Sequence, residues 1–325
     1  MSPHRASAGI VAPPPEPRAA GAGPRPTKTR AAALSIASNS GLILLKVAAG
    51  AITGSVAILS EAMHSSIDLI ASIVAYVSVR KADEPADADH RYGHEKIENL
   101  SAAIEGMLIL VGSAVIAFEA IRHLVVGSEV QRLGVGIVVV GVSAVANLTV
   151  GGIVARRARA TESAALEGDA AHLRTDALTS IGVLVGLVLV QVTGADWIDP
   201  IVALAVAAAI VVSGVRILTR SSRVLVDEAL PADEQRAIQD AVRSFGPRGV
   251  AGYHKLRTRR AGARRYVDLH VQFRAGTTLE DAHAIAHELQ DAIRARVRGA
   301  DVLIHLEPEG NVRPGTEIKP TPTAG

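Results

Sequence analysis

Long apolar runs alternate with short polar segments over the first two thirds of the chain. A helix needs about 20 mostly apolar residues to cross the hydrocarbon core of a membrane. Six runs have roughly this length, at residues 32–52, 57–79, 97–124, 133–155, 175–192 and 200–218. So many runs in close succession are hard to reconcile with the alternative, a large soluble domain with buried helices. The pattern therefore predicts an all-α, six-helix transmembrane domain over residues 31–222.

The pattern changes after the sixth run, where charged residues become frequent and the apolar runs shorten. The spacing then predicts a helix, two strands, a second helix and a third strand, at residues 231–245, 253–258, 266–273, 277–297 and 302–306. The second helix opens with Thr277-Thr-Leu-Glu280, a capping-box sequence. This order predicts a small α+β domain with a three-stranded sheet over residues 223–311.

The two ends of the chain have a different composition. Residues 1–30 are rich in proline, alanine, glycine and arginine, and residues 312–325 are rich in proline and threonine. Such segments bury too little apolar surface to become ordered, so both are expected to be disordered tails. The first is not expected to be a signal peptide, because no compact apolar core precedes a cleavage site.

Lysine and arginine are distributed unevenly among the polar connections. They are frequent in the N-terminal segment, the second-to-third and fourth-to-fifth connections and the segment after the sixth run. The first-to-second and fifth-to-sixth connections contain none, and the third-to-fourth connection has few. The positive-inside rule then places both termini in the cytoplasm. Since no organelle signal is visible, we expect a prokaryotic inner (plasma) membrane.

Composition excludes several classes of protein. The chain has no cysteine, which excludes disulfides, Cys-type zinc fingers and thiol catalysis. Its formal net charge is only +2, and its arginines are not interleaved with aromatic residues, so nucleic acid is not an expected partner. The sequence lacks an H-E-x-x-H motif, which argues against a zinc hydrolase and for a protein that is not an enzyme.

Two predicted spans carry the same pair of ionisable residues. His64-Ser-Ser-Ile-Asp68 lies in the second span, and His172-Leu-Arg-Thr-Asp176 opens the fifth. Residues four apart share a helix face, and an ionised side chain inside a membrane costs about 2.5–3.5 kcal/mol, so these pairs are functional candidates. A single pair could merely cap a helix or bond internally, but two copies favour a shared site. Two imidazoles and two carboxylates without thiolates suit a tetrahedral zinc ion.

Two other charged residues in the predicted spans have more than one interpretation. Glu61 shares a helix face with His64, and it either lines a metal pathway or is an interfacial side chain in contact with water. Lys46, in the first span, is expected to extend to the membrane interface or to pair with a carboxylate. Neither residue is assigned to the metal site on the sequence alone.

Several motifs together resemble the cation diffusion facilitator family, over residues 32–308. They are Gly54-Ser-Val-Ala57, the two His/Asp pairs, the loop at residues 85–94 with Lys96 and Glu98, and Leu225-Val-Asp-Glu-Ala-Leu-Pro231. The resemblance implies a homodimer in the lipid bilayer that exports a divalent metal from the cytoplasm in exchange for protons, by alternating access. It also implies that the cytoplasmic domain has a ferredoxin-like fold.

The resemblance implies a transport site at His64, Asp68, His172 and Asp176. Well-known bacterial members have aspartate where this chain has His64, and the histidine resembles the pattern of animal zinc transporters. Zinc is therefore the expected cargo, ahead of cadmium and manganese, while iron and cobalt remain alternatives. A membrane-anchored metal sensor without flux is a further alternative.

Three other groups are implied outside the spans. The loop residues Asp87, His90 and His94 match a second, cytoplasmic-side metal site, although such a loop could simply be solvated. Lys96 and Asp227 match a charge pair that joins the two domains at the dimer interface. A binuclear metal cluster is implied in the cytoplasmic domain, with a histidine-rich sheet surface as the alternative. The residues that match this cluster are His254, His270, His283, His305 and Glu307.

Overall fold

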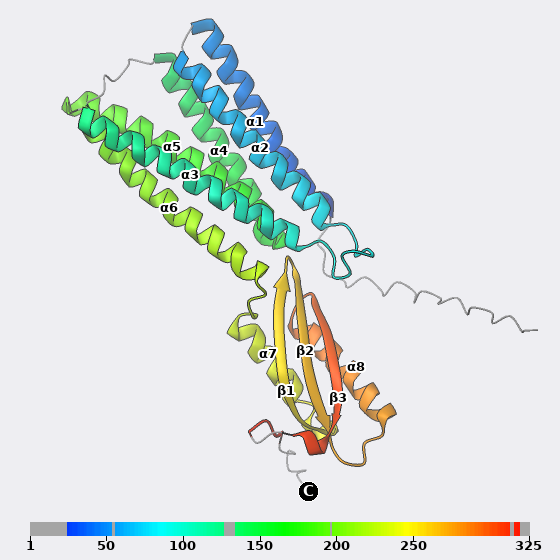
Figure 1. Ribbon diagram of the computed structural model, residues 1–325. Helices are drawn as coiled ribbons and strands as arrows, with labels where there is room; N and C mark the ends of the chain where they lie inside the picture. Colours follow the sequence, from blue (N-terminus) through cyan, green and yellow to red (C-terminus); the bar gives the residue numbers. More distant parts are fainter. Residues whose placement is uncertain (1–24, 54–55, 127–133, 196, 313–314, 319–325) are drawn as a thin grey trace, which may run out of the picture.

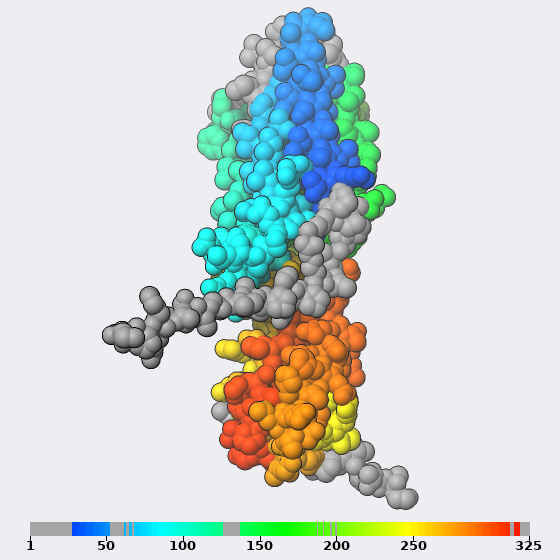
Figure 2. Space-filling model, turned by 90° about the vertical axis from the view of Figure 1, so that its right-hand side faces the viewer, coloured from blue at the N-terminus to red at the C-terminus, as the bar shows by residue number. Residues whose placement is uncertain are grey.

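The computed structural model describes residues 25–53, 56–126, 134–195, 197–312 and 315–318. Within them, six long helices form a bundle at one end of the molecule, and a small domain of helices and strands lies at the other end (Figure 1). The bundle helices are α1 (Arg25–Thr53), α2 (Val56–Ala82), α3 (Lys96–Val126), α4 (Gly134–Thr161), α5 (Ala164–Thr193) and α6 (Ile198–Leu225). Seen from the side, the two parts are stacked end to end (Figure 2).

The bundle exposes apolar side chains and buries polar ones, which is the reverse of a soluble helical domain. Val111, Phe118 and Val212 are exposed, whereas Glu105 and Asp169 are buried. Among the described residues, five helices are long and apolar enough to cross a membrane, namely α1, α3, α4, α5 and α6. Lipid tails accept an apolar outer surface, and helices satisfy their backbone hydrogen bonds internally. The chain therefore has a helical transmembrane domain.

The expected disordered tails are only partly covered by the structure. Helix α1 begins at Arg25, so the last residues of the expected N-terminal tail are helical, while residues 1–24 lie outside the described part of the chain. At the other end, the Ile318 amide donates a hydrogen bond to the Ala251 carbonyl at 2.8 Å. Glu317 also forms an antiparallel bridge with Gly252 of β1, so part of the expected C-terminal tail is bound to the edge of the sheet.

Helix α5 begins earlier than its apolar run predicts. Its first turn is capped by Ser163, whose hydroxyl accepts a hydrogen bond from the Leu166 amide at 3.4 Å. The helix thus starts well before the predicted span at 175–192, and His172 lies about two turns inside it rather than at its start. A prediction from apolar content misses this first part because it contains several polar residues.

The C-terminal domain has the predicted order of helix, strand, strand, helix and strand. Its elements are α7 (Ala232–Arg243), β1 (Val250–Ala261), β2 (Arg264–Phe273), α8 (Leu279–Arg296) and β3 (Ala300–Pro308). The strands form one mixed sheet in the order β1-β2-β3, with β1 antiparallel and β3 parallel to β2. Helix α8 is capped by Thr278, which accepts from the Asp281 amide, one residue later than the predicted capping box.

Alternation along β2 separates the two faces of the sheet. Val267, Leu269 and Val271 are buried with residues of α7 and α8 in the hydrophobic core of the domain. The residues between them, including His270, point to the opposite face, because neighbouring side chains in a strand alternate. The histidines of the sheet therefore lie on the face away from the core.

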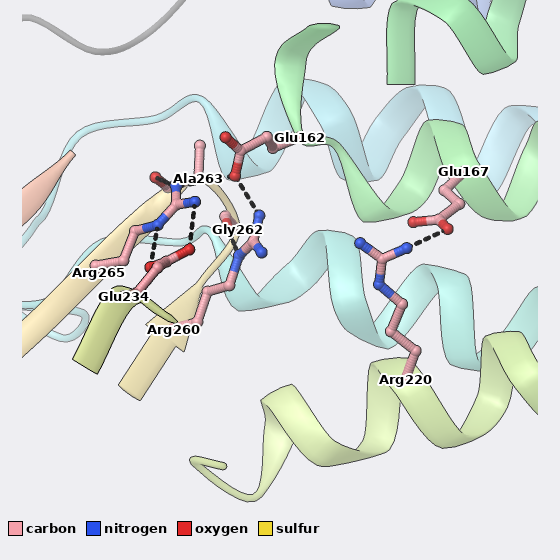
Figure 3. A network of polar contacts seen from close by, with 8 residues as sticks. All are labelled: Glu162, Glu167, Arg220, Glu234, Arg260, Gly262, Ala263 and Arg265. Carbon is pink, nitrogen blue, oxygen red and sulfur yellow. Dashed lines mark hydrogen bonds and ion pairs between the residues drawn. The ribbon is translucent and has the colours of Figure 1, made fainter. Parts of the chain in front are cut away.

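The tip of the β1–β2 hairpin contacts the connection between α4 and α5 (Figure 3). Arg265 Nη1 lies 2.8 Å from Glu162 Oε2, and Arg265 Nε lies 3.2 Å from Glu234 Oε2 on α7. Arg260 also pairs with Glu162. Because Arg265 is buried, these charge-assisted hydrogen bonds hold the hairpin firmly against the transmembrane domain.

Candidate metal centres

Asp68 on α2 meets His172 and Asp176 on α5 inside the helix bundle, and these three residues are called the intramembrane group. His172 Nε2 lies 3.2 Å from Asp68 Oδ1 and 3.8 Å from Asp176 Oδ2. Asp68 and His172 are buried, and Asp176 is partly buried. Their spacing of four residues places His172 and Asp176 on one face of α5. The side chains of His64 and Glu61, which were expected in this region, lie outside the described part of the chain.

The intramembrane group has the composition and spacing of a site for a divalent metal. One ligand atom from each residue lies within 4.8 Å of the other two. Zinc binds histidine nitrogen and carboxylate oxygen at about 2.0–2.2 Å, so atoms this close need to move only slightly to share one ion. Nitrogen and oxygen donors without sulfur suit zinc and also other first-row divalent metals.

Further polar residues, which were not predicted from the sequence, surround the intramembrane group. Asp169 on α5 accepts hydrogen bonds from Ser35 on α1 at 2.5 Å and from Ser72 on α2 at 2.9 Å. Asn39 on α1 donates to Ser72 at 3.0 Å. The network therefore ties three helices together beside the metal ligands. The sequence does contain a signal for Asp169, because it precedes His172 by three residues and shares its helix face.

Glu105 on α3 is a second buried carboxylate that was not predicted. Neither of its carboxylate oxygens has a hydrogen-bond partner among the described residues. It packs against Gly168 of α5, where an added Cβ atom would clash with Glu105 Oε2. An isolated buried carboxylate is unfavourable, so this group needs a proton or a nearby cation. A lone glutamate within an apolar run is the sequence signal for such a residue.

Lys46 of α1 is buried among the helices of the bundle. Its ammonium group donates to Ser65 Oγ on α2 at 2.7 Å. Ser65 lies about one turn before Asp68 on the same helix. Lys46 therefore places its amino group in the interior, close to the helix turn that carries a candidate metal ligand.

The loop between α2 and α3 brings Asp87, His90 and His94 together. His90 Nδ1 and His94 Nε2 each lie 3.3 Å from a carboxylate oxygen of Asp87. The backbone amide of His90 donates to this carboxylate and lowers the pKa of Asp87, which keeps it ionised. His94 is buried, and neither of its ring nitrogens makes a hydrogen bond with the described residues. Both carboxylate and imidazole are therefore available to bind a metal.

Strand register brings three histidines into one row across the sheet. His254 on β1 pairs with His270 on β2, which pairs with His305 on β3. His270 Nδ1 lies 2.6 Å from Glu307 Oε1, and His254 Nε2 lies 3.1 Å from Glu307 Oε2. Hydrogen bonds from His270 and Gln272 lower the pKa of Glu307 to about 2. His254, His270 and Glu307 form a compact potential metal-binding group, called the sheet group.

The other predicted histidines of this domain lie outside the sheet group. The ring of His305 lies beside that of His270, with centroids 4.5 Å apart and planes tilted by 48°, but its Nε2 is 4.0 Å from Glu307 Oε1. His283 lies on α8, where its Nε2 is 3.1 Å from that of His287, about one turn further along. Of the predicted ligands of the cytoplasmic cluster, the structure of one chain therefore brings together His254, His270 and Glu307, and His283 is not among them.

Lys96 at the start of α3 and Asp227 after α6 lie next to each other. Their side chains form an ion pair at 2.8 Å, and Lys96 also donates to the Leu225 carbonyl at 3.3 Å. Arg259 on β1 lies 3.4 Å from the same oxygen of Asp227. The hydrogen bond from Lys96 lowers the pKa of Asp227. The pair thus connects two helices of the bundle at the point where the chain enters the C-terminal domain.

Two family models match the chain, one for each structural part. Residues 32–226 match the cation efflux transmembrane domain, and residues 230–309 match the cytoplasmic domain of cation efflux proteins. Together they cover the helix bundle and the C-terminal domain, including all three candidate metal groups.

Similar proteins are found among bacteria. An uncharacterized transporter of Synechocystis sp. is 35% identical over 275 residues, which are 85% of this chain and 88% of that protein. The cation-efflux pump FieF of Yersinia pestis is 37% identical over 268 residues, which are 82% of this chain and 88% of the pump. The zinc form of the putative zinc transporter CzrB is 34% identical, with a TM-score of 0.26, and the match covers 27% of this chain and 98% of that structure.

Proposed function

Because the chain belongs to the cation diffusion facilitator family of cation efflux transporters, we propose that it exports zinc from the cytoplasm in exchange for protons. The observation that carries the proposal is the convergence of Asp68, His172 and Asp176 inside the bundle. Ionisable side chains are unfavourable within a membrane, and a bound cation explains why two helices bring them together. His64 is proposed as the fourth ligand.

In the proposed cycle, the site opens alternately to the two sides of the membrane. When it faces inward, the carboxylates and neutral imidazoles replace the water shell of the metal. When it faces outward, protons occupy the imidazole lone pairs, because histidine titrates near neutral pH, and the metal leaves. The proton gradient then drives export, which makes the protein a secondary active transporter and not an enzyme.

Zinc is proposed over other divalent metals on the basis of the donor set. Two imidazole nitrogens and two carboxylate oxygens suit tetrahedral zinc, whereas manganese prefers oxygen donors. Iron, cobalt and cadmium are the competing cargoes. A membrane-anchored sensor that binds metal without flux is the remaining alternative.

We propose a homodimer in a prokaryotic inner membrane, with six spans in each chain and α2 as one of the six. Both termini would lie in the cytoplasm, because arginine and lysine are frequent in the connections at that end. The order of helices and strands in the C-terminal domain supports a ferredoxin-like fold. The Lys96–Asp227 pair is proposed to hold the two domains together at the dimer interface.

The loop and the C-terminal domain are proposed to hold regulatory metal. His94, which is buried, and His254, which is partly buried, support this, because each places its Nε2 within 3.3 Å of a carboxylate oxygen of its group and neither Nδ1 has a hydrogen-bond partner among the described residues. Metal bound there would change the free-energy balance between the inward- and outward-facing states. The proposed ligands are Asp87, His90 and His94 in the loop, and His254, His270, His283, His305 and Glu307 in the domain.

The proposal is tested by zinc uptake into proteoliposomes of the purified protein under an imposed pH gradient, with manganese and iron as comparators. Zinc uptake that depends on the gradient and disappears in Asp176→Ala is the expected result. Asp291→Ala is the matched control, because it removes an exposed aspartate of α8 that belongs to none of the three candidate metal groups. That variant should transport like the wild type.

Each other result identifies a different error. Zinc binding without flux of any metal would favour the sensor. Flux of iron or manganese in place of zinc would be consistent with the proposed transport site but would contradict the proposed selectivity for zinc. Normal zinc flux in Asp176→Ala would show that the intramembrane group is not the transport site.

A further inference from the structure

A cavity of about 680 Å³ opens where α6 leaves the bundle and the chain enters the C-terminal domain. Four arginines line this arginine pocket, namely Arg216, Arg220 and Arg223 from α6 and Arg260 from β1. Glu228 is the only acidic residue among its described lining residues. The pocket therefore has an excess of positive charge at the edge of the transmembrane domain.

The α6 arginines of the pocket differ in how far their charge is balanced. Arg220 pairs with Glu167 on α5 (Figure 3), and Arg223 lies 3.7 Å from Glu228. Arg216 is exposed and has no charged partner among the described residues. Because the paired arginines are also exposed, their guanidinium groups keep free donors for a further anion.

Arg260 shows the effect of the crowded positive charge. It is partly buried and pairs with Glu162. Burial lowers the pKa of Arg260, and the neighbouring Arg265 and Arg220 also lower it, while Glu162 and Glu234 only partly offset this effect. An anion bound in the pocket would reduce this repulsion.

The arginines continue an apolar surface of α6. Val212, Arg216 and Arg223 lie on one face of the helix, because they are separated by four and seven residues. Val211, Val212 and Val215 are exposed on a helix that is apolar and long enough to cross a membrane. The surface thus changes from apolar to basic within one turn, as a membrane changes from hydrocarbon to headgroups.

We propose that the arginine pocket binds the phosphate of an anionic phospholipid whose acyl chains lie along the apolar surface of α6. Guanidinium groups bind phosphate oxygens in a bidentate manner, and basic pockets beside membrane helices bind anionic headgroups. Arg216 and Arg223 are about 10 Å apart along the helix, which is more than the roughly 5–7.5 Å depth of one headgroup layer, and long arginine side chains can bridge the difference. Free phosphate has the same chemistry, but it does not explain the adjoining apolar surface. This site is independent of the transported metal.

The test is a native mass-spectrometry titration of the metal-free, full-length protein in detergent, with phosphatidylglycerol and phosphatidylcholine of identical acyl chains. The wild type should bind phosphatidylglycerol more tightly. Each arginine near an anionic lipid surface contributes roughly fivefold in affinity, so Arg216→Gln combined with Arg223→Gln should weaken phosphatidylglycerol binding roughly 25-fold. Both side chains are exposed, so gel filtration should show an unchanged protein.

Two control variants keep the proposal falsifiable. Arg157→Gln removes an exposed arginine of α4 outside the pocket and should leave the affinity near that of the wild type. The double variant Arg216→Lys/Arg223→Lys keeps the charge and should lose less affinity for phosphatidylglycerol than the double glutamine variant. If the double glutamine variant does not fold, the lysine variant is compared with the wild type in its place.

Three results would overturn the proposal. They are equal wild-type affinity for the two lipids, an equal loss in Arg157→Gln, and displacement of phosphatidylglycerol by inorganic phosphate at millimolar concentration. The last result would identify a site for free anions in place of a lipid site.

Discussion

The intramembrane group and the sheet group use similar ligands but are held together in different ways. The sheet group is fixed by hydrogen bonds between strands, in a register that pairs His254 with His270. The intramembrane group depends on the packing of two separate helices, because Asp68 on α2 faces His172 on α5. A strand that slips by one residue turns its side chains to the other face, whereas packed helices slide by small amounts without losing their own hydrogen bonds.

This difference suits the two proposed roles. A transport site has to bind and release its cargo in each cycle, and a small movement of α2 would separate Asp68 from His172. His172 and Asp176 would move together, because they lie one turn apart on α5. A regulatory site instead has to report metal through a constant geometry, which three paired strands provide.

The largest effect is expected from Asp68→Asn in the intramembrane group. The amide keeps the shape of the carboxylate but lacks its charge, so zinc flux into proteoliposomes should fall by more than about 100-fold, beyond the effect of residues that only orient ligands. Zinc held by the sheet group, measured by equilibrium dialysis, should be unchanged. Wild-type flux in this variant would remove Asp68 from the site, and Asp291→Asn serves as the exposed control.

A smaller and different effect is expected from Glu307→Gln in the sheet group. Glu307 faces both His254 and His270 and is itself a proposed ligand, so its neutral analogue should weaken zinc binding in the C-terminal domain by at least about 10-fold, the smallest effect typical of residues that only orient ligands. At saturating zinc the maximal flux should stay within about twofold of the wild type, while the zinc concentration needed for half-maximal flux should rise. An unchanged concentration dependence would count against a regulatory sheet group.

The sequence predicts those features that depend on residues close together in the chain. The pair His172 and Asp176 follows from helix periodicity, and the order of strands and helices follows from alternation and turn residues. The contact of Asp68 with α5 was expected because the same spacing occurs twice and because the family resemblance implies one shared site. The capping residue Ser163 is also visible in the sequence, but the polar residues after it hide the start of α5.

Other features depend on packing between distant segments and were not predicted. Glu105 reaches α5 only because α3 packs against it, and Asp169 finds its partners Ser35 and Ser72 only because α1 and α2 do so, and helix-to-helix distances are not encoded in periodicity. The buried position of Lys46 likewise requires Ser65 from another helix. In the C-terminal domain, helix periodicity accounts for the contact of His283 with His287, but it does not show that His283 stays outside the group formed by His254, His270 and Glu307.

The stability of the C-terminal domain without metal should also depend on pH, because the sheet group contains a carboxylate with a lowered pKa. The pKa of Glu307 is lowered from its ordinary value of 4.5 to about 2, so its contribution to folding is present above pH 4.5 and is lost as the pH falls towards 2. One extra proton bound on unfolding changes stability by at most about 1.4 kcal/mol per pH unit. Hydrogen exchange of the sheet amides between pH 5 and 3 should therefore show steeper destabilisation in the wild type than in Glu307→Gln. Equal slopes would remove this carboxylate as the cause.

The smallest effect is expected from Arg257→Ala, which tests whether side chains outside the sheet group help to fix its register. Arg257 Nη2 lies 3.3 Å from Asp268 Oδ2 across β1 and β2, but both side chains are exposed. An exposed ion pair contributes up to about 1 kcal/mol, so the free energy of unfolding of the C-terminal domain in urea should change by no more than that. Zinc binding by the sheet group should be unaffected. A larger loss of unfolding free energy, or weaker zinc binding, would mean that backbone pairing alone does not hold His254 and His270 in place. The sheet group would then depend on side-chain contacts, as the intramembrane group does.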